Sequence, residues 1–324
     1  MLAFKVPLGN AITGPMDSMQ VFDRTLVRRR RDRAADGFAR ADFLFQESAG
    51  RLTDRLFDVT RDFPLALDLG CHTGQVAGAL APNARIGTLL QCDFSSAMSA
   101  AAARNGRPSF CADEEFLPLA EHSLDLVLSN LSLHWVNDLP GALAQIRRAI
   151  KPDGLFLATL FGGETLRELR TALLEAEAET AGGVAPRVSP FTDVRDAGNL
   201  LTRAGFALPV VDADTITVTY GDMFKLMADL RAMAETNAVI ERRKVPTARR
   251  TFLRAAEIYA EHFTNDRGRL NATFQVITLT AWVPHPSQPK ALRPGSATAR
   301  LADVLKTEEV ALGETTPFAP DKKT

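Results

Sequence analysis

Four groups of polar residues stand where short apolar runs end, in the stretch between Leu65 and Trp135. In chain order they are Asp68-Leu-Gly70-Cys-His72-Thr-Gly74, Asp93, Asp113-Glu114-Glu115 and Ser129-Asn130. Acids, amides and glycines in such places are typical of binding sites in parallel sheets, because the carboxyl ends of parallel strands meet at one edge. We therefore expect these four groups to lie close together.

The acids indicate which ligand this edge would receive. Asp93 closes an apolar run, and a carboxylate there accepts hydrogen bonds from both hydroxyls of a ribose. Met98 is placed to contact an adenine ring through its thioether, and Asp113 or Glu114 would accept the adenine amino group. Asp68 suits a cationic amino group better than a phosphate, and no basic residue follows the turn. The set therefore favours S-adenosylmethionine over a dinucleotide.

The turn after the first run departs from the usual pattern of glycines. Gly70 and Gly74 allow backbone N–H groups to approach a ligand closely, but the middle position, normally a third glycine, is His72. If this position needs a positive φ, a residue other than glycine costs about 1–2 kcal/mol. The imidazole would rotate outward, hydrogen-bond the ligand carboxylate, or block the pocket. We favour outward rotation, because the acids for the ribose and the adenine are all present.

Strand-like runs alternate with helical stretches from residue 63 onward. This alternation predicts a parallel sheet with helices on both faces. Seven runs are typical of strands, and the sixth, residues 207–220, is expected to be interrupted near Asp212 to Asp214. About 50 residues with helical spacing separate the last two strands, and a lid there, at about 221–268, would cover the carboxyl edge of the sheet.

The chain divides into four predicted segments. They are a disordered leader (1–18), N-terminal helices packed outside the main sheet (19–62), the sheet-containing domain (63–284) and an extended tail (285–324). The N-terminal helices carry four successive arginines, Arg28 to Arg31. This run could bind an acidic partner, but we favour a solvated helix face.

The composition limits the classes of function. The 324 residues carry 38 basic and 39 acidic side chains, and a net charge of −1 argues against a dedicated nucleic-acid binder, which needs a basic surface. The three cysteines are expected to be free thiols of a reducing cytosol. No apolar run approaches the ~18 residues of a membrane span. The five histidines form no close pair with a carboxylate, so we expect no metal site.

Several segments together resemble one known family. They are VFDR, FPLALDLG, ADEEFLPL, SLDLVLSNLSLHWVNDLPGAL, KPDG, FGGETLRELR, SPFTDV and LLTRAGF, and the resemblance covers the chain from Met19 to about Arg300. These segments are similar to the mitochondrial complex I assembly factor 5 family, whose members have the class I S-adenosylmethionine-dependent methyltransferase fold. The resemblance implies a Rossmann-like, doubly wound α/β sheet of seven strands, with N-terminal helices and a helical insertion between the last two strands.

The resemblance also implies an activity and site residues. The family is implicated in hydroxylating an arginine on an iron–sulfur subunit of NADH:ubiquinone oxidoreductase, so that subunit is the implied partner. Asn130 and His134 would lie near the reacting sulfonium or the substrate, although His134 could instead cap the helix that follows it. His72 would stand among the residues that the family uses to bind S-adenosylmethionine. Those residues are Asp68, Gly70, Gly74, Asp93, Met98, Asp113 and Glu114.

Two other functions stay open at this point. The malonyl-carrier-protein methyltransferase of biotin synthesis shares the SNLxLxW and GxTLxEL segments. Methyl transfer to a small molecule or to an acyl group on an acyl carrier protein is therefore an alternative, and it needs alignment more than catalytic side chains. A non-catalytic assembly scaffold is the third hypothesis. We expect a cytoplasmic protein, with peripheral attachment to the inner membrane as the alternative.

Overall fold

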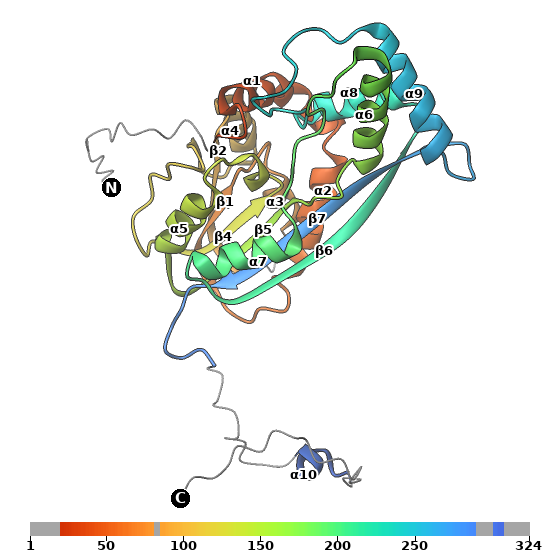
Figure 1. Ribbon diagram of the computed structural model, residues 1–324. Coiled ribbons are helices and arrows are strands. Elements are labelled where there is room, and N and C mark those ends of the chain that lie inside the picture. Colours follow the sequence, from red (N-terminus) through yellow and green to blue (C-terminus); the bar gives the residue numbers. More distant parts are fainter. Residues whose placement is uncertain (1–19, 81–84, 290–300, 308–324) are drawn as a thin grey trace, which may run out of the picture. The chain divides into compact units, whose positions relative to one another are not determined.

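The computed structural model describes residues 20–80, 85–289 and 301–307. Its centre is a seven-stranded sheet with the order β3-β2-β1-β4-β5-β7-β6 (Figure 1). The strands are β1 (Phe63–Leu69), β2 (Ile86–Asp93), β3 (Ser109–Cys111), β4 (Leu124–Asn130), β5 (Ile150–Phe161), β6 (Ala207–Tyr220) and β7 (Leu270–Trp282). The first five run parallel, whereas β7 is antiparallel to both of its neighbours. The predicted seven-stranded α/β fold is confirmed, but the sheet is mixed rather than parallel throughout.

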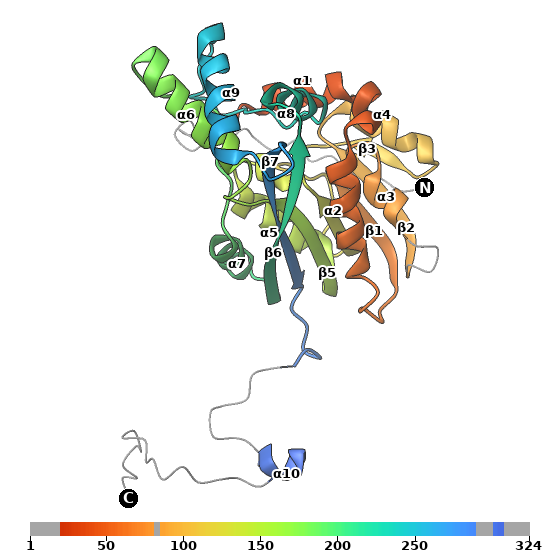
Figure 2. The same ribbon diagram turned by 90° about the vertical axis from the view of Figure 1, so that its right-hand side faces the viewer.

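Helices cover both faces of the sheet (Figure 2). Leu143 of α5 and Leu201 of α7 share a buried cluster with Leu67 of β1, whereas Leu52 of α2 and Val76 of α3 share another with strand residues of the opposite face. Successive side chains of a strand point to opposite faces, so an apolar run such as LALDL needs a helical cover on each side. These helices are α2 (Phe43–Asp54), α3 (Gln75–Ala79), α5 (Leu139–Ala149) and α7 (Val194–Arg203).

The N-terminal helices cover one face of the sheet and its carboxyl edge. They are α1 (Arg24–Ala34), the 3-10 helix η1 (Ala35–Arg40) and α2. Asp23 caps the N-terminus of α1, where its side chain accepts a hydrogen bond from the Leu26 N–H, and α1 packs against α4 (Ser96–Ala102). Phe38 of η1 and Phe45 of α2 are fully buried. The predicted N-terminal helices are present, and α2 packs against one face of the sheet.

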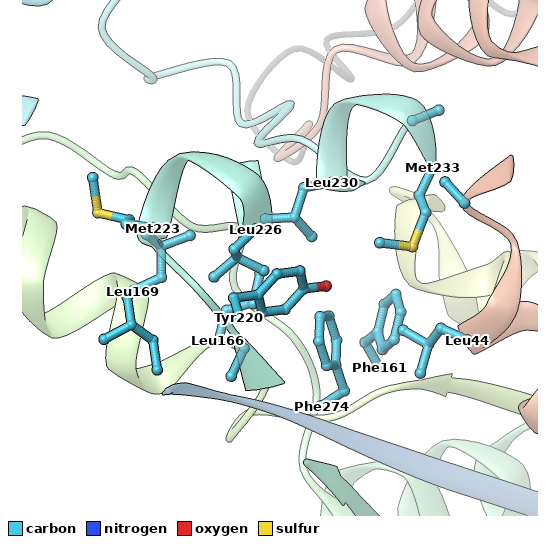
Figure 3. Packing of buried hydrophobic residues seen from close by; sticks show 14 of the residues in the cluster. Leu44, Phe161, Leu166, Leu169, Tyr220, Met223, Leu226, Leu230, Met233 and Phe274 are labelled. Atoms are coloured by element: carbon cyan, nitrogen blue, oxygen red, sulfur yellow. The ribbon is translucent and has the colours of Figure 1, made fainter. Parts of the chain in front are cut away.

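A helical insertion separates β6 from β7, as predicted. It contains α8 (Met223–Ala232) and α9 (Arg249–Phe263), and α9 packs along α6 (Arg167–Ala181). Leu226 and Leu230 of α8 lie over Leu166 and Phe274 in a buried cluster (Figure 3). The predicted interruption of β6 at Asp212 to Asp214 is wrong, because pairing with β7 continues through both residues. The irregularity lies between Ala207 and Val210 instead.

The remaining short elements include two 3-10 helices near the sheet edge, η2 (Ala103–Asn105) and η3 (Leu133–Trp135). The predicted leader, 1–18, lies outside the described residues. Contacts divide the chain after His285 into two units. Of the predicted extended tail, 285–324, residues 290–300 and 308–324 lie outside the described residues, and Leu301–Leu305 forms a short helix, α10. Within the described ranges no helix is long and apolar enough to span a membrane.

Candidate functional site at the carboxyl edge of the sheet

The glycine turn after β1 has the backbone geometry that the sequence suggested. Gly70 has a φ of 70° and Gly74 a φ of 98°, and a Cβ at Gly70 would lie 2.1 Å from the Ser132 hydroxyl oxygen. His72 also has a positive φ, 50°, so the middle position carries the strain expected of a residue other than glycine. The His72 N–H donates to Asp93 Oδ2 at 3.0 Å, which joins the turn to the end of β2.

The imidazole of His72 points into the protein, so the favoured outward rotation is wrong. The ring is 2% exposed, stacks on Phe38 with centroids 5.6 Å apart, and meets Phe45 edge-on at 4.6 Å. Its Nε2 lies 3.1 Å from the Asn130 carbonyl oxygen. Burial, together with the charge of Arg31, holds the pKa of His72 well below its usual value. A neutral His72 therefore fastens η1 and α2 over the turn.

Replacing His72 by glycine is expected to lower the free energy of unfolding by about 1–2 kcal/mol. Relief of the positive φ is worth about 1–2 kcal/mol, but loss of a buried ring from a packed aromatic cluster costs more. His122 is the matched control, because it has the same φ of 50° but is exposed, so His122→Gly should relieve the strain without losing a buried ring and should not lower the free energy of unfolding. Urea unfolding of both variants measures the difference. A stabilised His72→Gly protein would contradict the packing role.

A buried guanidinium lies between the acids expected to bind the ribose and the adenine. Arg31 of α1 is 1% exposed, and its Nη1 lies 3.3 Å from Asp93 Oδ2 and 3.4 Å from Glu114 Oε1. Its Nη2 donates to the Ser132 hydroxyl at 3.0 Å. The predicted solvated helix face therefore holds for the exposed Arg28 and is wrong for Arg31. The acids converge, as predicted, but on an arginine of this chain.

A second arginine of α1 reinforces this contact. Arg24 Nη2 donates to Asp113 Oδ1 and Glu114 Oε2, each at 2.5 Å, and its guanidinium lies over the Phe94 ring. Burial disfavours ionisation of Glu114, but the charges of Arg24 and then Arg31 outweigh it and lower its pKa to about 2. Burial raises the pKa of Asp93 although Arg31 opposes this. Helix α1 is thus held across the site by buried ion pairs.

Asp68 differs from the other acids because its carboxyl group pairs with no basic side chain in the described part of the chain. It is fully buried at the end of β1, and neither carboxyl oxygen has a hydrogen-bond partner among the described atoms. Burial, followed by the nearby charge of Asp93, raises the pKa of Asp68 to about 8. A buried polar group without a partner costs free energy, so Asp68 is poised to receive a donor or a cation.

Two of the predicted site residues face the protein interior. Met98 is fully buried in the hydrophobic cluster that contains Phe38 and Phe45, so the predicted exposure of its thioether to an adenine does not hold in this arrangement. The Asn130 amide donates to the Phe45 carbonyl at 2.9 Å, and its oxygen accepts from the Thr159 hydroxyl. Asn130 therefore ties α2 to β4 and β5.

His134 joins a buried group that the sequence did not reveal. Its Nε2 lies 3.0 Å from Glu235 Oε2, and the Trp135 indole donates to the same carboxylate at 3.0 Å. Glu235 follows α8, about a hundred residues along the chain, and its only sequence signal was an acid amid the apolar stretch that follows MFKLMADL. The alternative that His134 caps α5 is wrong, because Asp138 occupies that position.

The surroundings of the His134–Glu235 pair are aromatic. Phe161 and Phe191 pack on the imidazole, with ring centroids 4.8 and 5.6 Å away. His134 Nδ1 is buried and has no hydrogen-bond partner among the described atoms. Since Nε2 is directed at a carboxylate, we assign the proton to Nε2, which leaves the Nδ1 lone pair free to accept a hydrogen bond.

The titratable groups at this edge are not arranged as a metal site. Within residues 20–80, 85–289 and 301–307, no group of three or more histidines, cysteines and acids is placed to hold an ion. The cysteines of the described part are free thiols, with Cys71 and Cys92 buried and Cys111 exposed.

Comparisons with known proteins relate this geometry to a family. A family model described as a methyltransferase domain matches residues 67–158. The chain is 46% identical over 292 residues to arginine-hydroxylase NDUFAF5, mitochondrial, from Danio rerio. The match covers 89% of this chain and 90% of that protein. It is 38% identical over 276 residues to malonyl-[acyl-carrier protein] O-methyltransferase from Methylovorus sp. (strain MP688). That match covers 82% of this chain and 90% of that protein.

A solved structure supports the fold. Phosphoethanolamine N-methyltransferase 2 from Haemonchus contortus, in complex with S-adenosyl-L-methionine, has a TM-score of 0.50 and 16% identity, with 80% of this chain and 60% of that chain covered. A likeness at this identity concerns the fold alone. Because the sequence relatives match nine-tenths of the chain, the resemblance read from the motifs is confirmed. The chain is an enzyme of the S-adenosylmethionine-dependent methyltransferase superfamily and belongs to the family of arginine-hydroxylase NDUFAF5.

Proposed function

We propose that this enzyme hydroxylates an arginine on an iron–sulfur subunit of NADH:ubiquinone oxidoreductase and so supports assembly of that complex. The relatives that match nine-tenths of the chain are named arginine-hydroxylases. The observation that carries the proposal in this chain is the His134–Glu235 pair, an acceptor and a carboxylate enclosed by aromatic rings. Such surroundings suit a guanidinium, which donates hydrogen bonds and stacks on aromatic faces.

The pair would position the target side chain. Glu235 orients the imidazole, and His134 Nδ1 would accept a hydrogen bond from a guanidinium N–H. Phe161 and Phe191 would hold the guanidinium plane and exclude water. The hydroxylation would take one oxygen atom from dioxygen, with an external two-electron donor and two protons converting the second oxygen atom to water, while these side chains would bind and align the arginine.

S-adenosylmethionine is the cofactor that we propose for the turn after β1. The uncompensated Asp68 fits its cationic amino group, and Asp93 and Glu114 are the acids that suit a ribose and an adenine. When bound, the cofactor supplies an electrophilic methyl group on a sulfonium. Arg31 lies between Asp93 and Glu114, so the adenosine group would fit only after this arginine withdraws.

The proposal is tested by the mass of the target arginine. The iron–sulfur subunit is purified from cells that lack this gene and carry either the natural chain or the His134→Gln chain, and its arginine-containing peptides are weighed. We expect one added oxygen atom with the natural chain and at least about a tenfold loss of modification with His134→Gln, since one hydrogen bond to a charged group is lost.

The other outcomes separate the competing functions. An added methyl group would replace hydroxylation by methyl transfer, and an unmodified subunit would leave only an assembly scaffold or a different substrate. Thermal unfolding of His134→Gln provides the control for folding, because a glutamine keeps one hydrogen bond to Glu235. Localisation in the cytoplasm, or peripherally at the inner membrane, stays part of the proposal and is read from fractionation of the same cells.

A further inference from the structure

A cavity of about 340 Å³ opens beside the His134–Glu235 pair. Glu235 and Phe191, which contact His134, both line it, so the cavity adjoins the place proposed for the target arginine. Its apolar lining includes Leu166, Leu169 and Leu230, which Figure 3 labels, with Leu169 on α6 and Leu230 on α8. The cavity is therefore positioned to hold what lies next to the reacting side chain.

Five arginines also line the cavity. They belong to Arg30, Arg187, Arg231, Arg242 and Arg243. Three of these arginines have carboxylate partners behind the cavity. Glu177 pairs with Arg187 and Arg243, and Asp23 pairs with Arg242 at 3.1 Å.

Two arginines of the cavity have no carboxylate partner within the described part of the chain. Arg30 Nη1 donates to the carbonyl oxygens of Thr236 and Asn237, at 2.6 and 2.9 Å, and Arg231 is exposed at the end of α8. Burial, and then the positive charge of Arg242, lowers the pKa of Arg30 to about 10. The charges of Asp23 and Glu235 act on Arg30 but do not outweigh its burial and the repulsion of Arg242, so an anion entering the cavity would stabilise this half-buried cation.

We propose that this cavity binds an acidic side chain next to the target arginine, with Arg30 and Arg231 as its ionic partners. The apolar lining would receive a neighbouring aliphatic side chain, so the recognised segment combines an arginine, an apolar residue and an aspartate or glutamate. As a substrate subsite the cavity rests on the proposed function, whereas its preference for an acid does not depend on which reaction follows. The five arginines also repel basic residues that flank other arginines, which gives the site selectivity.

The test uses the full chain and three synthetic pentapeptides with blocked ends. The first has a central arginine flanked on each side by a leucine and then an aspartate, and the second has asparagine in place of both aspartates. The third keeps the aspartates and has norleucine in place of the arginine. Isothermal titration calorimetry should find the aspartate peptide at least about tenfold tighter than the asparagine peptide, as one charge-assisted hydrogen bond would give.

Two variants then test whether an arginine of the cavity causes the preference for the aspartate peptide. Arg231→Gln should remove most of the difference between the two peptides, because Arg231 is exposed and its loss leaves no described ion pair broken. Arg195→Gln is the matched control, since Arg195 is exposed on α7 and does not line the cavity. It should leave the difference unchanged.

Several results would overturn the proposal. Equal binding of the aspartate and asparagine peptides would do so, and so would an equal effect of Arg231→Gln and Arg195→Gln, which would indicate only the overall charge. The norleucine peptide separates this proposal from the proposed function. If norleucine costs no affinity while the aspartates still matter, the placement of the target arginine fails and the acid-binding cavity stands.

Discussion

Replacing Arg31 by methionine is expected to raise the affinity for S-adenosylmethionine by at least about tenfold and to destabilise the protein without ligand. Arg31 is buried between Asp93 and Glu114, so the adenosine group and this guanidinium compete for the same acids. The apparent affinity of a ligand falls with the population of the state that can bind it, and the variant no longer has to break an ion pair to reach that state. Removing one partner of a buried pair costs about 3–5 kcal/mol.

The measurements are calorimetric titration with S-adenosylmethionine and urea unfolding of the free protein. Arg29→Met is the matched control, because Arg29 is exposed on the same helix and should change neither quantity. An Arg31→Met protein with unchanged or weaker affinity would show that the guanidinium does not compete with the cofactor. In that case Arg31 would be a permanent part of the site.

Binding of S-adenosylmethionine is expected to release close to one proton at pH 7. Burial holds the pKa of Asp68 at about 8, so the free protein carries a neutral Asp68 at that pH. A cationic amino group beside it favours the carboxylate and drives the proton off. Titrations in two buffers with different heats of ionisation, such as phosphate and Tris, measure the released proton. Asp68→Asn should release none, and equal heats in both buffers for the natural chain would contradict this role.

The same group makes the free protein sensitive to pH. The pKa of Asp68 is higher in the folded chain than in the unfolded chain, so its contribution to stability is complete below about pH 4 and is lost as pH rises to about 8. Between pH 5.5 and 8.5 the natural chain should therefore lose about 3 kcal/mol more than Asp68→Asn does. Urea unfolding of both proteins at the two pH values checks the sign. A greater loss in Asp68→Asn would exclude the raised pKa.

The fold was predictable because it follows from local patterns. Alternating apolar runs and helical stretches specified seven strands, and the spacing between the last two specified the insertion that contains α8 and α9. The continuity of β6 was not predictable, since Asp212 and Asp214 interrupt a buried pattern but are tolerated on an edge strand that pairs on one side only. The order of β6 and β7 in the sheet likewise depends on long-range pairing, which no local pattern encodes.

The acids of the site were predictable, but their partners were not. Asp68, Asp93 and Glu114 stand at strand ends and therefore converge at one edge of the sheet. Arg31 lies 62 residues before Asp93, in a run of arginines whose members look equivalent in sequence. Only the phase of helix α1 over the sheet distinguishes the buried Arg31 from the exposed Arg29, and tertiary packing sets that phase. Glu235 was missed for the same reason, because it meets His134 through a contact between distant segments.

The position of β7 in the sheet has a consequence for synthesis of the chain. β6 pairs only with β7, which lies between it and β5, so β6 has no hydrogen-bonded neighbour until residues 270–282 have left the ribosome. The nascent chain can assemble β1 to β5 early, because each of these strands pairs with at least one other strand of the set. The α8 and α9 segments, which border the basic cavity, become anchored at both ends only in the last stage of translation. The half of the protein that would meet the substrate is thus completed last, after the half that would meet the cofactor.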